Sequence, residues 1–79
     1  MSSAAERHRL TRLALTTWGE VAEMLAERGE VWPNTDPMTW GVGLQLAMAR
    51  MQALAEASTL IGGPDLHQLI SLYEQETTR

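Results

Sequence analysis

The chain has 79 residues, no cysteine and a net charge of −4 at pH 7. This length allows one domain, which buries only about 60% of the surface of its unfolded chain and is marginally stable alone. Disulfides and thiolate metal sites are excluded, so oligomerisation is the remaining way to stabilise so small a core. We therefore expect a single domain over residues 1–79 that associates with a second copy.

The sequence shows no sign of export or of membrane insertion. The first fifteen residues, MSSAAERHRLTRLAL, carry charges where a signal peptide has its apolar core. The longest uncharged run, residues 37–49, is too short to span a bilayer. We expect a cytoplasmic protein that has no membrane contact.

A first helix is predicted over about residues 4–28. Apolar residues recur there at steps of three and four, which is the pattern of one helical face. Gly29 follows where a helix commonly ends in a residue with positive φ. Trp18 lies one position beyond this face, which consists of Leu10, Leu13, Ala14, Thr17, Val21, Met24 and Leu25.

A second helix is predicted over residues 37–58, after the connection EVWPNTD. Asp36 is a good N-cap, and Pro37 suits the first helical position. The helix carries one apolar stripe of Trp40, Leu44, Ala47, Met51, Leu54 and Ala55, and another of Val42, Leu46, Ala49 and Ala53. Since both faces are apolar, the segment must be buried by other helices or by a second copy of the chain.

Glycines mark both ends of this second helix. Gly41 and Gly43 favour close packing of a neighbouring helix over unwinding of the first turns, whereas Gly62 and Gly63 end the helix. A third, one-sided helix follows over residues 64–76, with its apolar face on Leu66, Leu69, Ile70 and Tyr73. The expected fold is an all-α three-helix bundle around the second helix, completed by homodimerisation.

No residue pattern indicates catalysis or metal binding. His8 and His67 lack the third and fourth ligands that zinc requires. Pairs of glutamates lie on expected solvent faces, where general acid–base catalysis has no cleft to use. We predict a protein that is not an enzyme and that has no cofactor.

Tryptophan and methionine are the residues most suggestive of a binding surface, because both are enriched at protein interfaces. We expect Trp18 to lie at an interface. Trp32 and Trp40 are equally consistent with an interface and with fastening the connection to the core. The candidate interface is therefore Trp18, Trp32, Trp40, Met48 and Met51.

Charge is unevenly distributed along the chain. Residues 1–12 hold Glu6 against Arg7, Arg9 and Arg12, whereas the remainder holds nine carboxylates against three arginines. An acidic body repels phosphate backbones but suits a basic protein surface, including one that normally holds nucleic acid. The three N-terminal arginines are candidates for contact with nucleic acid or with an acidic partner.

Glu30-Val31-Trp32-Pro33, the apolar helix after it, and Gly62-Gly63 with Asp65-Leu66 resemble short phage proteins encoded among tail-assembly genes. The resemblance covers less than half of the chain and implies an assembly role in a phage tail.

The absence of catalytic patterns points to stoichiometric protein–protein binding. One form is a phage- or mobile-element-encoded inhibitor of a host nucleoprotein machine, similar in kind to an anti-CRISPR protein. A phage morphogenesis factor is the alternative, and a small DNA- or RNA-binding module that uses Arg7, Arg9 and Arg12 is the alternative from another class.

Overall fold

A computed structural model describes residues 3–78 and has the expected all-α architecture. Its helices are α1 (Ala4–Glu27), α2 (Val42–Leu60) and α3 (Leu66–Thr77), and a short 3-10 helix, η1 (Pro37–Thr39), precedes α2. The described residues contain no β-strand. The three predicted helices, at about 4–28, 37–58 and 64–76, correspond to these three, and the largest difference lies at the start of the second.

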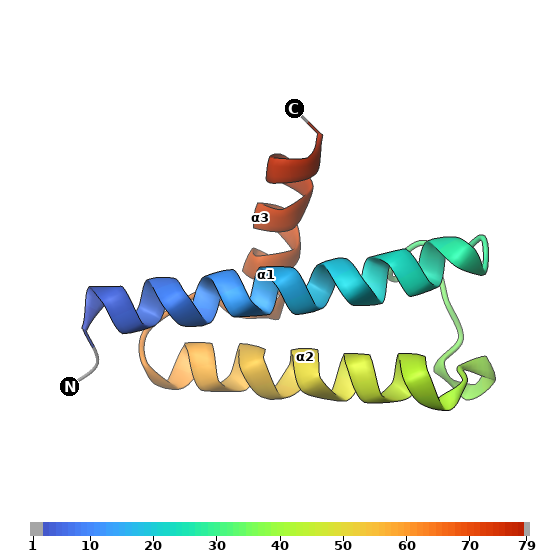
Figure 1. Cartoon of the computed structure of the whole chain (residues 1–79), viewed down its shortest axis with the longest axis horizontal. Helices are drawn as coiled ribbons and strands as arrows, with labels where there is room; N and C mark the ends of the chain where they lie inside the picture. The colour runs from blue at the N-terminus through green and yellow to red at the C-terminus, as the bar shows by residue number, and fades with distance from the viewer. Residues whose placement is uncertain (1–2, 79) are drawn as a thin grey trace.

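The helices α1 and α2 form an antiparallel hairpin, and α3 crosses behind it and projects past α1 (Figure 1). α1 packs against both other helices, whereas α2 and α3 touch each other less. α2 therefore buries one of its two apolar stripes in the single chain, with Leu44, Ala47, Met51 and Ala55 in the core. The second stripe, which begins at Val42, stays in solvent.

Two glycines end the first two helices in the same way. Gly29 (φ 74°) follows α1, and the amide of Glu30 donates to the carbonyl of Leu25 at 2.9 Å. Gly62 (φ 82°) follows α2, and the amide of Gly63 donates to the carbonyl of Ser58 at 2.8 Å. Both are Schellman motifs, in which the left-handed residue lets the chain turn back onto the last helical carbonyls.

The start of α2 differs from the prediction. Asp36 does act as an N-cap, accepting from the amide of Met38 at 3.0 Å, but it caps the 3-10 turn. Trp40 is then extended, Gly41 is the extended N-cap of α2, and the helix begins at Val42. No neighbouring atom lies within 4 Å of a Cβ built on Gly41 or Gly43, so the prediction of close packing at these glycines is wrong. The break allows the Trp40 side chain to enter the core.

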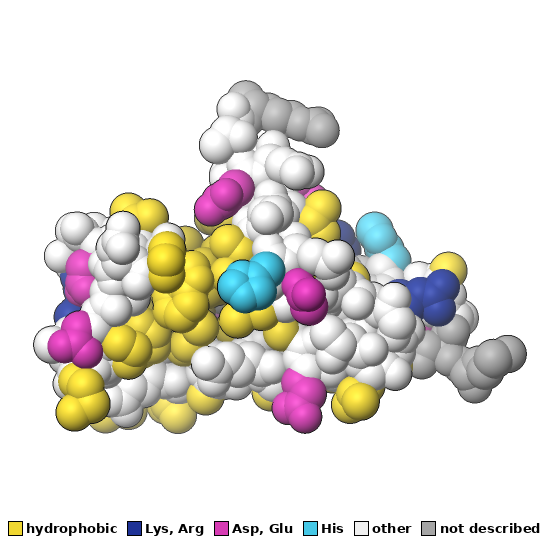
Figure 2. All heavy atoms as spheres, turned by 180° about the vertical axis from the view of Figure 1, so that it is seen from behind, with side chains coloured by type: hydrophobic (Ala, Val, Ile, Leu, Met, Phe, Trp, Pro, Cys, Tyr) yellow, Lys and Arg dark blue, Asp and Glu magenta, His cyan; other side chains and the backbone are white. Residues whose placement is uncertain are grey.

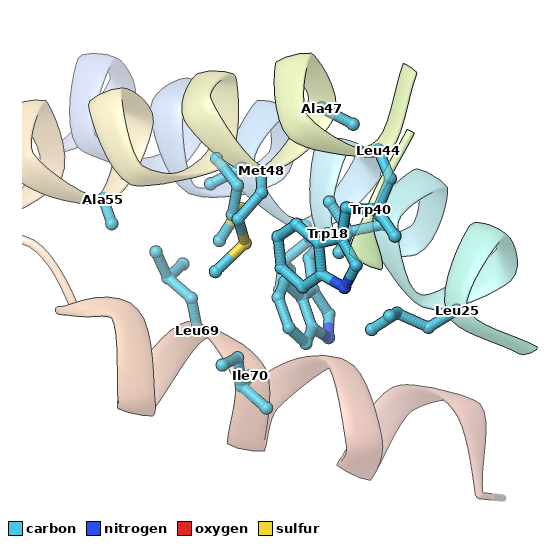
Figure 3. Close-up of a cluster of buried hydrophobic side chains, with 13 residues drawn as sticks. Trp18, Leu25, Trp40, Leu44, Ala47, Met48, Ala55, Leu69 and Ile70 are labelled. Atoms are coloured by element: carbon cyan, nitrogen blue, oxygen red, sulfur yellow. The ribbon is translucent and has the colours of Figure 1, made fainter. Parts of the chain in front are cut away.

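The core lies between the three helices, and all of them contribute to it. Trp18 of α1 and Trp40 point into it beside Met48 of α2 and Leu69 of α3 (Figure 3). The fully or nearly buried apolar residues are Ala14, Leu15, Trp18, Val21, Leu25, Trp40, Leu44, Ala47, Met48, Met51, Ala55, Leu69 and Ile70.

The turn between α2 and α3 has no room for a side chain at Gly63. A Cβ there would lie 2.6 Å from Ser58 Oγ, which is buried and donates to the carbonyl of Pro64 at 2.7 Å. We expect Gly63→Ala to lower the free energy of unfolding by about 1–3 kcal/mol, the usual cost of overpacking. Urea denaturation followed by circular dichroism measures this change.

Gly43→Ala is the matched control for that substitution. Gly43 lies in the first turn of α2 with open space around it, so alanine there should stabilise by roughly 0.5 kcal/mol through helix propensity. Equal effects of the two substitutions would show that the turn at Gly63 is not tightly packed.

Candidate protein-binding surface

Trp32, in the loop between α1 and η1, is only partly buried. Its indole meets that of Trp18 edge to face, with ring centroids 5.8 Å apart and an interplanar angle of 86°. This is a favourable aromatic arrangement, and it fixes Trp32 against α1. The remainder of the indole is available to a partner.

Two apolar hollows share Trp32 as a lining residue. One, of about 360 Å³, is completed by α2 and the turn before it, through Pro37, Trp40, Gln45, Met48, Ala49 and Gln52. The other, of about 240 Å³, lies between α1 and α3 and is completed by Trp18, Ala22, Leu25, Ala26, Glu30, Val31, Tyr73 and Glu74. We call Trp32 and these two hollows the Trp32 surface.

Hydrophobic side chains gather around this surface, between α3 and the end of the hairpin where α1 leads to α2 (Figure 2, left). Val31, which lines the second hollow, is 72% exposed, and Met38, next to Pro37 of the first, is 90% exposed. Large apolar side chains this exposed, beside ready-made hollows, are a mark of interaction sites.

Hydrogen bonds hold the loop that carries Trp32. The Trp40 Nε1–H donates to Thr35 Oγ1 at 2.7 Å, and the Thr35 hydroxyl donates to Glu30 Oε2 at 2.7 Å. The guanidinium of Arg28 donates to the other oxygen of Glu30 and, at 2.6 Å, to Thr39 Oγ1. These hydrogen bonds connect the end of α1 to η1, so the Trp32 surface is preformed in the free protein.

Glu30 makes this loop sensitive to pH. Hydrogen bonds from Thr35 and then Arg28, together with the Arg28 charge, hold the pKa of Glu30 below its ordinary value of 4.5. A lowered pKa means that the folded state favours the ionised carboxylate. Its contribution to stability is therefore present above pH 4.5 and disappears as the pH falls through the lowered pKa.

We expect Glu30→Gln to lower the melting temperature at neutral pH, and the difference from the wild type to vanish at low pH. Thermal melts at neutral pH and well below pH 4.5 test this expectation. Glu27→Gln removes the same charge from the end of α1 and controls for net charge. A difference between wild type and Glu30→Gln that is constant with pH would contradict the assigned role.

Four interface candidates are buried in the structure, and for Trp40 this agrees with the second of its two open interpretations, fastening of the connection to the core. Trp18, Trp40, Met48 and Met51 are buried within the single chain and belong to its core. Trp18, Trp40 and Met48 also line the hollows.

Trp32 is the predicted interface residue that keeps a partly exposed side chain. Val31, Met38 and Tyr73 complete the surface around it, and sequence reasoning missed them. For Val31 a signal was present, since it is a large apolar residue in the predicted connection, whereas Met38 fell inside the helix predicted over residues 37–58.

The predicted arginine cluster is divided. Arg12 Nη1 donates to both carboxylate oxygens of Glu76, at 2.8 and 3.0 Å, so its charge is engaged by α3. Arg7 lines a third, open hollow of about 780 Å³ with His8 and His67, whereas Arg9 is exposed. The three arginines therefore have different surroundings, and their contact with nucleic acid or with an acidic partner stays a prediction.

The described part of the chain offers no other recognisable site. Between residues 3 and 78, no three His, Cys, Asp or Glu side chains are placed to bind a metal ion. No helix among the described residues combines the length and apolar character needed to cross a bilayer.

Comparisons with protein-family models, curated proteins and solved structures found no match. The two hollows beside Trp32 are smaller than the one lined by Arg7, His8 and His67, but their linings are more apolar.

Proposed function

We propose that this protein is not an enzyme and acts by stoichiometric binding of another protein through the Trp32 surface. The observation that carries the proposal is the partly exposed indole of Trp32 between two apolar hollows. Tryptophan is the residue most enriched at binding hot spots, and preformed apolar hollows accept the anchoring side chains of a partner. The hydrogen-bonded loop reduces the ordering cost of association.

The charges around the surface indicate the chemistry of the partner. Glu74 lines the second hollow and Asp36 lies beside Pro37 of the first, whereas the charge of Glu30, also in the second hollow, is paired with Arg28. An apolar centre with acidic residues at its edge complements a partner that presents apolar anchors among basic residues. The net charge of −4 favours the same kind of partner.

A basic partner surface is typical of proteins that hold nucleic acid. We therefore favour an inhibitor of a nucleoprotein machine, of the kind that phages and mobile elements encode, acting in the cytoplasm. The resemblance of Glu30-Val31-Trp32-Pro33 to phage tail-assembly proteins keeps a morphogenesis factor as the alternative. A nucleic-acid-binding module is less well supported, because Arg12 is paired with Glu76 and the charge of the chain is negative.

Capture from lysates of the native host tests this proposal. Val31→Ser with Met38→Ser removes exposed apolar contacts in the second hollow and beside the first without altering charge, and Leu13→Ser on α1 is the control away from both hollows. We expect the wild type and Leu13→Ser to retain the same protein in stoichiometric amount. The double variant should retain at least tenfold less, as loss of a hot-spot contact implies.

Equal retention by all three proteins would refute the Trp32 surface as the binding site. Random duplex DNA at low salt is the second arm of the experiment. Tight binding that is lost in Arg9→Ala with Arg12→Ala would instead identify a nucleic-acid-binding module, whose affinity falls steeply with salt.

A further inference from the structure

The indole of Trp18 has an unused hydrogen-bond donor. Trp18 is 3% exposed, and its Nε1–H donates to no described residue, whereas that of Trp40 donates to Thr35. Among the described residues, no side-chain nitrogen or oxygen is both fully enclosed and unpaired. The small exposed part of Trp18 therefore includes its nitrogen.

This nitrogen opens into the second hollow of the Trp32 surface. Trp18 lines that hollow and neither of the other two. Figure 3 shows the indole nitrogens of Trp18 and Trp40 on the ring edges turned toward Leu25 and α3, and Leu25 and Tyr73 of α3 line the same hollow. A partner that covered the hollow and left the Trp18 donor unpaired would lose the free energy of its hydration.

Two polar groups of α3 also line the second hollow without a partner in the described part of the chain. The Tyr73 ring lies over Gly19, 3.3 Å from a Cβ built there, and its hydroxyl makes no hydrogen bond with a described residue. The carboxylate of Glu74 is likewise unpaired, whereas that of Glu30 is paired with Arg28. The hollow thus offers an indole donor and a carboxylate acceptor within apolar walls.

The size of the second hollow fits one side chain. Its volume is about 240 Å³, which is below the range of about 300–1,000 Å³ that is typical of small-molecule sites. An apolar cavity of about 150 Å³ already holds a benzene ring. The hollow therefore has room for a single aromatic ring with a polar substituent, which is the size of one anchoring side chain.

We infer that the occupant of the second hollow is the phenol of a tyrosine on the protein partner, an inference that rests on the proposed function. The ring of this tyrosine lies against the apolar walls. Its oxygen accepts from Trp18 Nε1–H, and its hydroxyl donates to the carboxylate of Glu74, which makes a charge-assisted hydrogen bond.

Other side chains match these groups less well. Phenylalanine and tryptophan have no acceptor for the indole donor, and lysine and arginine have donors only. A carboxylate would be repelled by Glu74. Neutral histidine both donates and accepts, but a neighbouring carboxylate favours its cationic form, which has donors only. Serine, threonine and the side-chain amides carry no ring to fill the apolar walls.

Titration of the ¹⁵N-labelled full chain with N-acetyltyrosinamide tests the inference, because each indole N–H gives its own NMR signal. We expect a saturable shift of the Trp18 signal, with the signal of Trp40, already bonded to Thr35, unchanged. The Kd should be at least about fivefold lower than for N-acetylphenylalaninamide, which leaves the donor unpaired. Equal affinity of these two probes, or tighter binding of N-acetylargininamide or N-acetylhistidinamide, would overturn the inference.

The O-methyl ether of the tyrosine probe separates the two hydrogen bonds, since it keeps the acceptor but has no proton for Glu74. We expect Glu74→Gln to weaken binding of N-acetyltyrosinamide at least about threefold and to leave binding of the ether unchanged. Glu56→Gln removes the same charge on α2, outside both hollows, and should change neither. Equal effects of Glu74→Gln on the two probes would contradict the hydrogen bond assigned to Glu74.

Ala22→Leu tests the location of the site. Ala22 of α1 lines the second hollow and is only partly buried, so leucine there should fill the hollow in a folded protein. Ala53→Leu is the same change at an exposed position of α2 outside both hollows. We expect Ala22→Leu alone to abolish probe binding, with far-UV circular dichroism confirming the fold. If it unfolds, Ala26→Leu, at an exposed position of the same hollow, replaces it, and probe binding that persists in the folded variant would overturn the inference.

The probe titrations need no partner, so failure of this inference differs from failure of the proposed function. Host-protein capture that depends on Val31 and Met38, with probes that bind equally well, would retain the Trp32 surface as a protein-binding site and overturn the tyrosine anchor. Selective binding of the tyrosine probe, with capture that does not depend on Val31 and Met38, would support the phenol site and refute the proposed function.

Discussion

Replacement of Trp18 by alanine is expected to remove most of the stability of the folded state. The side chain is 3% exposed and lies in the core between the helices, with Trp32 against its edge. Truncation of a buried tryptophan to alanine costs about 3–5 kcal/mol. The whole stability of natural domains is about 5–15 kcal/mol, and a domain of this size lies near the lower end. Far-UV circular dichroism and urea denaturation measure the loss.

Leu13→Ala is the control on the same helix. Leu13 is more than half exposed although it belongs to the apolar face predicted for the first helix, so its truncation should change stability by no more than about 0.5 kcal/mol. Comparing the two substitutions therefore shows whether the change in stability follows burial in the structure or membership of the apolar pattern in the sequence. Full helicity of Trp18→Ala, with loss of partner binding alone, would return Trp18 to the interface role predicted from the sequence.

Trp18 also shows which feature of α1, the width of its buried face, could not be predicted from the sequence. Helix periodicity and Gly29 are local signals, and they predict α1 within a residue of its observed end at Glu27. The width of the buried face is not local, because α3 crosses α1 and brings Tyr73 to within 3.3 Å of a Cβ built on Gly19. Leu15 and Trp18, which lie outside the predicted face, are buried, whereas Leu13 of that face is in solvent. No pattern within residues 4–28 contains this information.

The prediction of where the second helix begins was wrong for a related reason. Asp36 and Pro37 are genuine start signals, and the chain does turn there, but only for the three residues of η1. Trp40 then leaves the helical path to reach the core, and its indole donates to Thr35. That contact depends on a loop whose shape is set by Arg28 and Glu30. The apolar periodicity extends through Trp40 because it depends only on the spacing of apolar residues in the sequence. That spacing carries no information about the direction of the backbone.

The central residue of the Trp32 surface could be predicted from the sequence, but the shape of the surface could not. Trp32 was an interface candidate because of its residue type and its position in a connection. The two hollows beside it require the crossing of α3, which brings Tyr73 and Glu74 near Val31, and the loop that brings Pro37 near Met48. Both are consequences of tertiary structure.

The attachment of α3 should depend on one leucine. Leu69 and Ile70 are the only described residues of α3 that are buried, and Leu69 is completely enclosed. Leu69→Ala is expected to lower the free energy of unfolding by about 2–5 kcal/mol, the range found for truncation of buried leucines. Leu60→Ala is chemically the same change at an exposed position and should cost no more than about 0.5 kcal/mol when measured on dilute, monomeric protein.

The reason for so large an effect at Leu69 is that the other contacts of α3 are weak. The ion pair between Arg12 and Glu76 is largely exposed and contributes at most about 1 kcal/mol. Tyr73 is only partly buried against α1. Without Leu69, α3 is held by Ile70, by the partly buried Leu66 and Leu72, and by these contacts, so the wall that Tyr73 and Glu74 give to the second hollow should loosen. Leu69→Ala should therefore weaken partner capture together with stability, whereas equal effects of Leu69→Ala and Leu60→Ala on unfolding would contradict this packing of α3.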